Sequence, residues 1–446
     1  MEQTIKLRRG LNLHLEGEAQ KVVRQLPQPA EVAVRPTDFT GLTPKLLVRE
    51  GDEVVAGQAL LTDKQSGRIH IPSPIGGRVK SVVRGDRRKL LAVVVESVGK
   101  ADAPLSEGQG AVQEGSLVER LCQAGLFCFF RQRPYDVVAS PDDTPKGIFI
   151  STFSKMPLAA DFSFILKGEE EAFKEGLKAL ATIAPVHLGI CTCQEKLLGG
   201  LDALENVTVH RFDGPNPSGN VGVQINHVSP VNKGEIVWTL RPQAVIFIGR
   251  WMQTGRVDLR EKVAVAGSEV AEPQYVETIL GAPLRDLVGT VGAHQRVING
   301  NPLVGEKACA DDFLAAFVSE VCVLPEGDDV HEAFGWILPR LKQHSTSRSY
   351  LSWLMPGKKY APDCRIKGGK RHMIMSGEYD RVFPMDIFAG YLIKAIITGD
   401  IDRQEALGIY EVAPEDFAVA EYVDSSKLEL QRIVREGLDI LRKENA

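Results

Sequence analysis

The stretch TVHRFDGPNPSGNVGVQINHVSPVNKGEIVWTLRPQAVIFIG, residues 208–249, decides how the rest of the chain is interpreted. Residues 207–212 form a β-branched run that predicts a strand. Residues 213–222, called the glycine-rich loop below, contain so many Gly, Pro, Asn and Ser that no regular element is expected there. Residues 242–249 are apolar without alternation, which is typical of a strand buried on both faces. Such a loop beside a buried strand indicates an open α/β sheet with a ligand cleft.

The glycine-rich loop differs from the loops that bind nucleotides. Neither GxGxxG nor GxxxxGK[ST] occurs in it, and those spacings are the ones that fold backbone N–H groups around phosphates. Two interpretations therefore stay open. The loop is either a turn-rich connection at a domain face or a segment that contacts a ligand.

Length and composition narrow the classes of protein. A chain of 446 residues exceeds one hydrophobic core and predicts roughly three domains. With a net charge of -5, the sequence does not indicate a basic surface that binds nucleic acid. The N-terminus MEQTIKLRRG lacks the apolar core of a signal peptide, and no window of about 18 apolar residues predicts a membrane span. We expect any membrane association to go through a partner.

The cysteines and histidines give no sign of a metal site. Seven cysteines, the first at Cys122, indicate a reducing compartment rather than a disulfide scaffold. The closest pair is Cys191 and Cys193, whereas zinc and iron–sulfur sites need about four clustered ligands. We therefore predict that these two are free thiols, buried or at a strand end. The nine histidines form no HExxH motif, so zincin chemistry is not indicated.

Two segments near the N-terminus, 48–63 and 68–86, each predict a β-hairpin with a glycine turn. Together they resemble the biotinyl/lipoyl barrel-sandwich module. The matching residues are Val48, Gly51, Asp52, Val54, Gly57, Gln58, Leu60, Ile71, Pro74, Gly77 and Val79. One hypothesis makes Lys64 an acylated or biotinylated carrier lysine. Lys64 is closer to the preceding Gly-Gln turn than carrier lysines are, and its neighbours are Asp and Gln, so we favour an unmodified docking domain.

Strands and helices alternate after a predicted polar linker at 99–116. Residues 117–130 begin as a short helix, and the strand-like runs PYDVVAS and GIFIST follow. Residues 168–184 place apolar side chains on one helical face, and VHLGIC predicts the next strand. This alternation predicts a parallel sheet with right-handed crossovers.

The segment 261–305 combines short strands, a helix after Pro283 and glycine turns. It resembles the SLBB soluble-ligand-binding β-grasp module. The matching residues are Val265, Gly267, Pro273, Leu280, Gly281, Leu284, Leu287, Val297, Gly300 and Gly305. Such a unit binds a small ligand or docks on another protein, and we favour docking.

The last part of the chain predicts a helical domain. Residues 329–344 are amphipathic, and 386–397 predict an apolar helix. Ser426 with Glu429 fits a capping box in front of a final helical stripe. The basic cluster at 365–371 is interpreted as a solvated loop, with an acidic partner or lipid head groups as the alternative.

The predicted fold class is therefore a multi-domain α/β protein. We expect a barrel-sandwich domain over 1–100, a Rossmann-like α/β domain over 101–258, an SLBB-type β-grasp domain over 259–320 and a C-terminal helical domain over 321–446.

These modules, in this order, resemble the NqrA family, the A subunits of the sodium-translocating NADH:quinone oxidoreductase (the Nqr complex). The carrying motifs are LRRGLNL (7–13), the barrel segments, FDGPNPSGNVG (212–222), VAVAGSEV (263–270) and GEYDRVFPMDI (377–387). The resemblance covers essentially the whole chain. Asn216 stands where the family pattern has His, and Ser218 where it has a small residue such as Ala. These departures weaken any role of the loop's side chains in chemistry.

The resemblance implies a peripheral protein on the cytoplasmic face of the bacterial inner membrane, docked on the membrane protein NqrB of the same complex. The family is similar to the flavin-binding component of respiratory complex I and to the RnfC component of the Rnf complex. Both carry cofactors through motifs whose cysteine clusters or acidic loop residues this sequence lacks. We expect FMN, FAD, riboflavin and iron–sulfur clusters on partner subunits and none on this chain. No catalytic or metal-binding residue is expected.

A quinone contact is also attributed to this family. Quinones need an apolar slot with one or two polar anchors. The candidate contacts are Phe129, Phe130, Tyr135, Gly214, Gly219, Asn220 and His227. Two competing hypotheses remain: a carrier or transferase that uses Lys64, and a non-catalytic ligand sensor built on the β-grasp unit.

Overall fold

The computed structural model describes most of the chain. The described residues are 4–98, 115–330, 340–346, 350–374 and 377–445. The linker predicted at 99–116 and the amphipathic helix predicted at 329–344 lie for the most part outside them. No helix within the described ranges is long and apolar enough to cross a membrane.

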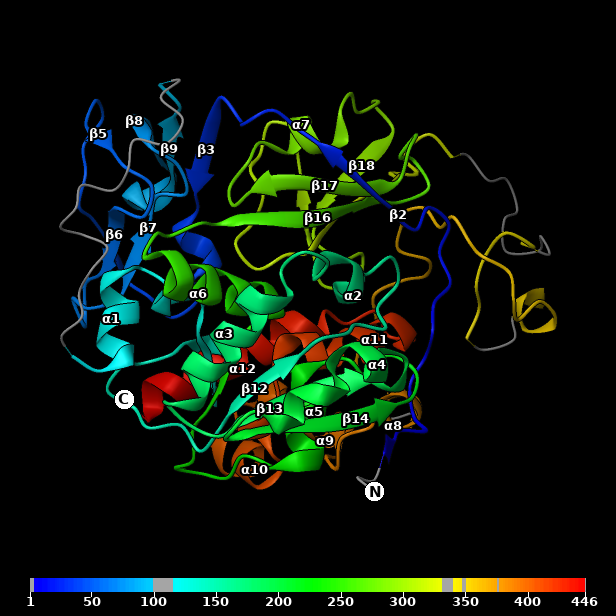
Figure 1. Cartoon of the computed structure of the whole chain (residues 1–446). Helices are drawn as coiled ribbons and strands as arrows, with labels where there is room; N and C mark the ends of the chain where they lie inside the picture. The colour runs from blue at the N-terminus through cyan, green and yellow to red at the C-terminus, as the bar shows by residue number, and fades with distance from the viewer. Residues whose placement is uncertain (1–3, 99–114, 331–339, 347–349, 375–376, 446) are drawn as a thin grey trace.

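The N-terminal region forms two small β-sheets packed face to face (Figure 1). The four-stranded sheet contains β3 (Glu31–Val34), β9 (Leu90–Glu96), β8 (Gly77–Arg84) and β5 (Glu53–Val54). The three-stranded sheet contains β4 (Pro44–Leu46), β6 (Ala59–Asp63) and β7 (His70–Pro72). The predicted strands are present, but the predicted hairpin pairing is wrong, because β5 pairs with β8 and β6 with β7. Each predicted hairpin instead sends its two arms into opposite sheets of the sandwich.

A seven-stranded sheet forms the centre of the molecule (Figure 1). Its order is β1 (Ile5–Lys6), β14 (Val207–Asp213), β13 (Val186–Cys191), β12 (Ile148–Ser151), β15 (Val237–Thr239), β10 (Arg131–Arg133) and β11 (Val137–Val138). The first five strands run parallel, which confirms the predicted parallel sheet, and β10 and β11 are antiparallel additions. Its helices are α1 (Leu117–Gln123), α2 (Phe162–Ile165), α3 (Glu170–Ala181), α4 (Glu195–Leu198), α5 (Val221–Val228) and α6 (Pro242–Thr254).

The buried strand predicted at 242–249 is wrong, because these residues form the first part of helix α6. Pro242 occupies the first turn, where its missing N–H costs nothing, and Gly255 ends the helix in the left-handed conformation. A Cβ atom on Gly249 would overlap the carbonyl oxygen of Ala172 in α3. The two helices therefore pack backbone to backbone, and α6 is apolar on nearly all sides because α3, the sheet and the barrel domain surround it.

A six-stranded sheet follows. Its order is β19 (Glu306–Ala308), β18 (Gln295–Asn299), β20 (Glu320–Pro325), β16 (Arg260–Ala266), β17 (Gln274–Ile279) and β2 (Gln20–Gln25), with α7 (Leu284–Val288) packed against it. The N-terminal residues thus belong to two distant sheets, since β1 pairs with β14 and β2 with β17.

Short helices cover the central sheet on the side of the glycine-rich loop. They are α8 (Glu378–Val382), α9 (Ala389–Thr398), α10 (Ile401–Ala406), α11 (Ala418–Val423) and α12 (Leu430–Glu444). The capping box predicted from Ser426 and Glu429 is wrong, because α12 has no side-chain cap. Asp424 instead accepts the backbone N–H groups of Ser426 and Leu428, and Ser426 accepts from Ile374. A turn therefore precedes this helix.

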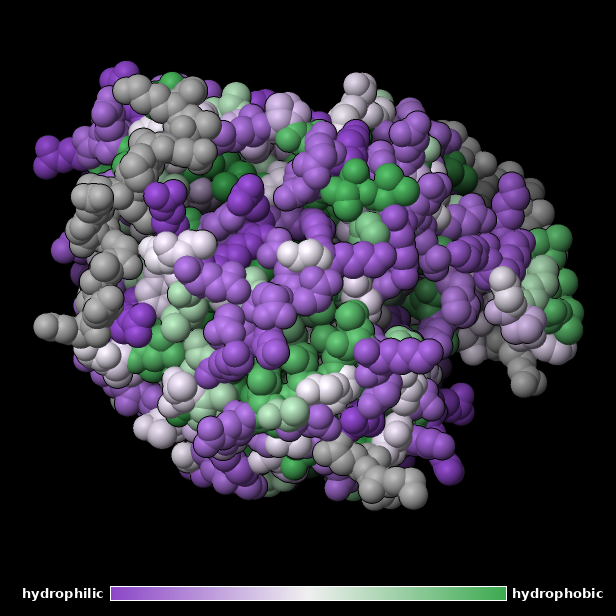
Figure 2. All heavy atoms as spheres, viewed as in Figure 1, coloured by the Kyte–Doolittle hydropathy of each residue, from purple (hydrophilic) through white to green (hydrophobic). Residues whose placement is uncertain are grey.

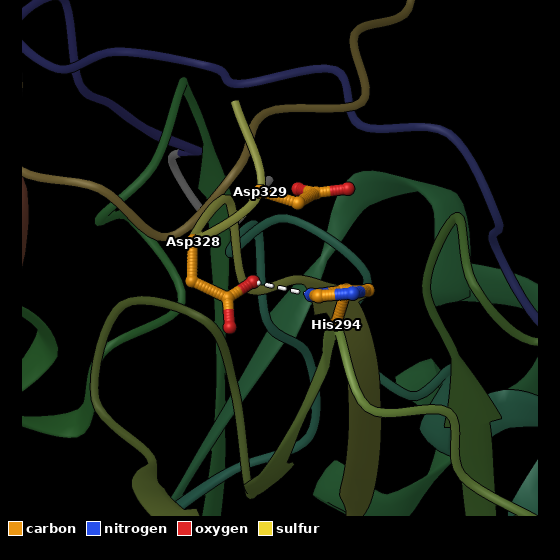
Figure 3. Close-up of side chains that lie close together, drawn as sticks. All are labelled: His294, Asp328 and Asp329. Atoms are coloured by element: carbon orange, nitrogen blue, oxygen red, sulfur yellow. Dashed lines mark hydrogen bonds and ion pairs between the residues drawn. The ribbon is translucent and has the colours of Figure 1, made fainter. Parts of the chain in front are cut away.

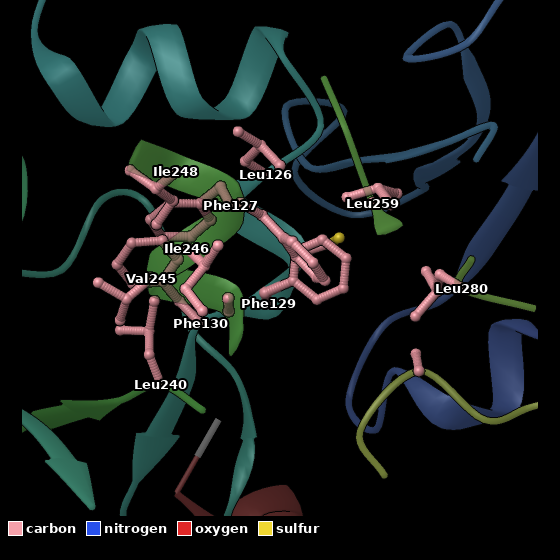
Figure 4. Close-up of a cluster of buried hydrophobic side chains, with 14 of the residues drawn as sticks. Leu126, Phe127, Phe129, Phe130, Leu240, Val245, Ile246, Ile248, Leu259 and Leu280 are labelled. Atoms are coloured by element: carbon pink, nitrogen blue, oxygen red, sulfur yellow. The ribbon is translucent and has the colours of Figure 1, made fainter. Parts of the chain in front are cut away.

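Two large hydrophobic clusters lie on opposite faces of the central sheet. One contains Phe127, Phe129 and Phe130 with α6 residues, and it continues into the barrel sandwich (Figure 4). The other joins the C-terminal helices to Phe212 and Val223, the residues that flank the glycine-rich loop. The C-terminal helices are thus built onto the sheet at this loop.

Candidate functional site at the glycine-rich loop

The glycine-rich loop leaves β14 and enters α5 at the carboxyl edge of the parallel strands. One side of it contacts the N-terminal motif LRRGLNL. Leu7 N–H donates to Asp213 O at 2.8 Å, Leu11 N–H donates to Asn216 O at 2.8 Å, and Asn216 N–H donates to the side chain of Asn12 at 2.9 Å. Two of the motifs that carried the family resemblance therefore pack against each other.

The second side of the loop lies on β12 and the segment that follows it. The Ser151 hydroxyl donates to Gly219 O at 2.7 Å and accepts from Gln224 Nε2 at 2.9 Å. A Cβ atom on Gly219 would stand 2.6 Å from Phe153 O, so only glycine allows this approach. The glycines of the loop thus serve close backbone packing.

The third side of the loop contacts η8 (Pro414–Phe417) of the C-terminal helices. Asn220 Nδ2 donates to Glu415 O at 3.1 Å. The carboxylate of Asp416 lies against Gly222 in the first turn of α5, and a Cβ atom on Gly222 would overlap it. A carboxylate of the chain itself therefore faces the helix start at which open α/β sheets bind phosphate.

A buried ion pair fixes that carboxylate. Arg133 Nη1 donates to Asp416 Oδ2 at 2.8 Å, and the two side chains are 2% and 0% exposed. Burial alone lowers the pKa of Arg133, but Asp416, Asp136 and Glu415 outweigh it and raise the pKa above its usual value. The backbone N–H of Ala413 also donates to Oδ2, while Oδ1 has no partner among the described residues. The arrangement joins β10 of the central sheet to the C-terminal helices.

The seven candidate quinone contacts fall in different places. Phe129 and Phe130 are buried in the hydrophobic cluster of Figure 4, on the face of the sheet opposite the loop. Tyr135 packs edge-to-face on Tyr410, and Arg435 donates to its carbonyl oxygen. Gly214, Gly219 and Asn220 lie together in the loop, and His227 at the end of α5 bonds to the carbonyl of Val223. The aromatic candidates and the loop candidates thus form no common slot, and a quinone contact stays a prediction.

Lys64 lies in the exposed turn between β6 and β7, where its N–H donates to Thr43 O at 2.7 Å. The same turn is closed by Asp63, whose carboxylate accepts from Ser66 and Thr43. This placement leaves the carrier hypothesis as a prediction.

The prediction that Cys191 and Cys193 are free thiols is wrong, because a disulfide joins them. β13 ends at Cys191, and the bend into η4 (Thr192–Gln194) brings the two Cα atoms to 5.2 Å, within the usual range for a disulfide. The sequence spacing alone did not reveal this bend.

Three side chains could hold a metal ion on geometric grounds: His294, Asp328 and Asp329 (Figure 3). His294 Nδ1 and Asp328 Oδ1 are 2.9 Å apart, and a hydrogen bond to Asp328 raises the pKa of His294. All three residues are exposed, so the cluster has the character of a solvated ion pair.

Two features at η6 (Leu351–Leu354) were not predicted from the sequence. Leu351, Trp353 and Leu354 are 41%, 51% and 57% exposed. Figure 2 shows hydrophobic spheres at the right edge of the molecule, where Figure 1 places this turn. The cluster of apolar letters in YLSWLM was the available signal.

The second missed feature is a cavity of about 810 Å³ between the segment that carries η6 and the body of the molecule. Tyr360 and Tyr422 contribute to its wall, with Lys342 and Lys367 among the basic residues of its lining. The Tyr360 side chain is buried, and its hydroxyl has no hydrogen-bond partner among the described residues.

Comparison with known proteins defines the class to which this architecture belongs. The model of the NqrA N-terminal barrel-sandwich hybrid domain matches residues 5–98, the NqrA second alpha/beta domain matches 112–257, and the NQRA C-terminal domain matches 262–310. All three are domains of one protein family, NqrA.

Curated relatives match along the full length. The chain is 32% identical to the A subunit of the Na(+)-translocating NADH-quinone reductase of Neisseria gonorrhoeae, with 99% of this chain and 100% of the relative covered. The values for Serratia proteamaculans are 34%, 99% and 100%, and for Rhodopirellula baltica 33%, 99% and 99%. The chain belongs to the NqrA family, the A subunits of the Na(+)-translocating NADH-quinone reductase, as its sequence motifs indicated. A solved NAD+-reducing [NiFe]-hydrogenase chain is 14% identical over 68% of this chain and 60% of its own length, with a TM-score of 0.35.

Proposed function

We propose that this chain is the peripheral NqrA component of a sodium-pumping respiratory NADH:quinone oxidoreductase and docks on the membrane protein NqrB at the cytoplasmic face of the bacterial inner membrane. The observation that carries the proposal is the match to relatives of that name across 99% of the chain. The absence of a spanning helix in the described residues agrees with docking through a partner. The isolated chain is not catalytic and acts by holding other subunits in place.

The domain types support this role. Five parallel strands with helices on both faces favour a Rossmann-like assignment for the central domain. The six-stranded sheet with α7 favours an SLBB-type β-grasp domain. Both domain types bind ligands in some proteins and partners in others, so site residues decide the function.

The chain binds no redox cofactor in this proposal, and FMN, FAD, riboflavin and iron–sulfur clusters belong to partner subunits. The support is the carboxylate of Asp416, which lies where a flavin or nucleotide phosphate would meet the first turn of α5. A phosphate there would overlap the Asp416 carboxylate, and Arg133 is already paired with that carboxylate. The absorbance spectrum of the purified chain tests this point, and a stoichiometric flavin or iron–sulfur band would overturn it.

Docking occurs through η6 in this proposal. Three large apolar side chains within four residues are exposed there, at the outer edge of the molecule (Figure 2). Exposed apolar groups of this kind mark interaction sites. The relatives are named as one subunit of a larger enzyme, so a protein partner is the fitting occupant.

Co-expression with NqrB followed by lysine crosslinking tests the docking surface. Lys358 and Lys359 lie next to η6, whereas Lys394 lies on α9 away from it. We expect crosslinks to NqrB from the first two lysines. Crosslinks from Lys394 alone would show that the chain docks through another face.

A quinone contact is the second candidate function. The cavity of about 810 Å³ beside η6 favours it, because the unpartnered hydroxyl of Tyr360 can donate to a quinone carbonyl within a partly aromatic wall. Photolabelling of the full complex with an azidoquinone tests this, with Tyr360→Phe as the variant. We expect label on peptides that line the cavity and a loss of label in the variant.

Intact mass separates these proposals from the carrier hypothesis. An acyl or biotinyl group on Lys64 would add its mass to the chain, and an unmodified mass removes that hypothesis. Binding of a small polar ligand that survives deletion of the first hundred residues would instead favour a ligand sensor.

A further inference from the structure

The disulfide between Cys191 and Cys193 lies at the carboxyl end of β13, a central strand of the seven-stranded sheet. Cys191 is buried, whereas Cys193 is exposed. The bond therefore has one sulfur on a residue open to solvent and one on a residue covered by the protein. None of the roles proposed above uses this pair.

Stability is a weak reason for such a bond. A disulfide stabilises a protein mainly by restricting the unfolded chain, and the effect grows with the length of the loop that it closes. Here the two cysteines are separated by a single residue, so the bond restricts almost nothing that the chain does not already restrict.

The turn around the disulfide is held by other bonds. Gln194 is buried, and its Oε1 accepts from Cys191 N–H at 3.2 Å and from the Thr152 hydroxyl at 2.9 Å. Gln194 Nε2 donates to Thr152 O at 2.9 Å and to the Ser163 hydroxyl at 3.0 Å. Because this network ties β12, β13 and α2 together without the sulfur atoms, the disulfide can open while the fold persists.

Three of the free cysteines differ from this pair. Burial raises the pKa of the free Cys122 thiol to about 12 and also raises the pKa values of Cys128 and Cys322. Those three thiols are poor nucleophiles at neutral pH.

We propose that Cys191 and Cys193 form a reversible redox site that exchanges electrons with dithiols. One thiolate of the dithiol attacks Cys193 Sγ, the bond between Cys193 and Cys191 breaks, and Cys191 Sγ takes the electron pair and then a proton. The second thiol of the dithiol attacks the mixed disulfide, leaves as a cyclic disulfide, and Cys193 takes the second proton. The dithiol loses two electrons and two protons, and the protein gains both.

The reductant belongs to the class of small dithiols or of proteins with a surface dithiol, since both offer a second thiol that resolves the mixed disulfide. The exposed position of Cys193 admits either source. Dithiothreitol, reduced glutathione and a dithiol reductase of the thioredoxin class serve as the three probes. Dithiothreitol tests a small dithiol and the reductase tests a dithiol protein, whereas reduction by the monothiol glutathione alone would contradict the assignment to dithiols.

The experiment follows alkylation of the native full-length chain by mass spectrometry. Without reductant we expect alkylation at the exposed Cys309 and a linked peptide that contains Cys191 and Cys193. After native dithiothreitol we expect both to be alkylated, roughly tenfold or more faster than Cys122 and Cys128. Once dithiothreitol is removed, an oxidised dithiol should restore the disulfide between Cys191 and Cys193.

Two variants serve as controls. Cys193→Ser should abolish the linked peptide and leave Cys191 as a free thiol, whereas Cys309→Ser should leave the couple unchanged. The unfolding temperature of the wild-type chain should be nearly the same before and after reduction, because the Gln194 network remains. Free Cys191 and Cys193 in the air-purified chain would overturn the proposal. A link that dithiols open only after denaturation would overturn it as well.

Discussion

The glycine-rich loop and the η6 turn are opposites. The loop has the composition of a ligand-binding segment, yet the N-terminal motif, β12 and the C-terminal helices enclose it on three sides. The η6 turn matches no motif, yet it exposes three large apolar side chains (Figure 2). The difference teaches that the glycines of this loop mark close internal packing, whereas the apolar residues of η6, which belong to no motif, mark an exposed surface for a partner.

The largest effect on the free energy of unfolding is expected at the enclosed glycine-rich loop. Arg133→Ala would leave the Asp416 carboxylate buried without its partner, since the pair is almost fully covered. We expect a loss of about 3–5 kcal/mol in the free energy of unfolding, measured by urea denaturation of the full chain.

Two control variants show whether that loss comes from the buried pair. Arg432→Ala at an exposed position of α12 removes only surface ion pairs and should cost less than about 1 kcal/mol. The double variant Arg133→Met with Asp416→Leu should recover much of the loss, because neither member of this pair is then left buried without the other. A loss in Arg133→Ala no larger than that in Arg432→Ala would mean that the loop is not sealed by this pair.

A second buried pair makes the joint between the central and six-stranded sheets sensitive to pH. Glu261 lies 3.5 Å from Arg241, and burial raises the pKa of its carboxyl from 4.5 to about 7 despite the attraction of that arginine. The folded state therefore holds a proton that the unfolded state releases, so stability falls as pH rises from about 4.5 to 7.

The substitution Glu261→Gln should remove that contribution. Between pH 5 and pH 8 the Glu261 carboxyl should lower the unfolding free energy of the wild type by about 2 kcal/mol, and the variant should lack this loss. The wild-type curve also contains the opposite contribution of His187, whose pKa burial lowers to about 4, so only the difference between the two proteins is diagnostic. Exposed Glu272→Gln is the matched control, and an equal pH dependence in all three proteins would contradict the prediction.

Adding one methyl group at Gly222 tests how closely the loop packs against η8. Gly222→Ala would place a Cβ atom on the Asp416 carboxylate, and overpacking of this kind costs about 1–3 kcal/mol. Gly200→Ala is the control because nothing lies within 4 Å of the added atom. If thermal unfolding shows equal stability in both variants, the first turn of α5 has room for a ligand after all.

The smallest change in the free energy of unfolding is expected at the exposed η6 turn. The double variant Trp353→Ser with Leu354→Ser should weaken binding to NqrB by roughly tenfold or more, because a few apolar side chains dominate such interfaces. The unfolding temperature of the isolated chain should not change. Tyr391→Ser alters an exposed side chain away from η6, on α9, and should leave the binding affinity unchanged. Equal weakening by both would move the docking surface away from η6.

Much of the fold could be predicted from local patterns. The strands of the barrel sandwich and the parallel strands β12 to β14 follow from β-branched runs between turns, because alternation and turn residues are local properties. Pairing between the barrel strands could not be predicted, since neighbours in the sequence entered opposite sheets. The run at 242–249 misled because a helix surrounded by protein on all sides has no polar face to reveal its period.

The candidate site was less predictable than the fold. The sequence located the loop, but not the segment that covers it, because Asp416 is far along the chain and an acidic residue there has no local signature. The disulfide was missed for a related reason. Whether two thiols in a Cys-x-Cys pair meet depends on the backbone bend between them, which composition does not encode.

The placement of β1 and β2 has a consequence for biosynthesis. β1 completes the edge of a sheet with β14, and β2 does so with β17, and both partners lie far along the chain. During translation β1 and β2 must therefore wait, unpaired, until their distant partner strands have been made. A truncation that removes residues 4–25 would for that reason disturb two distant sheets together.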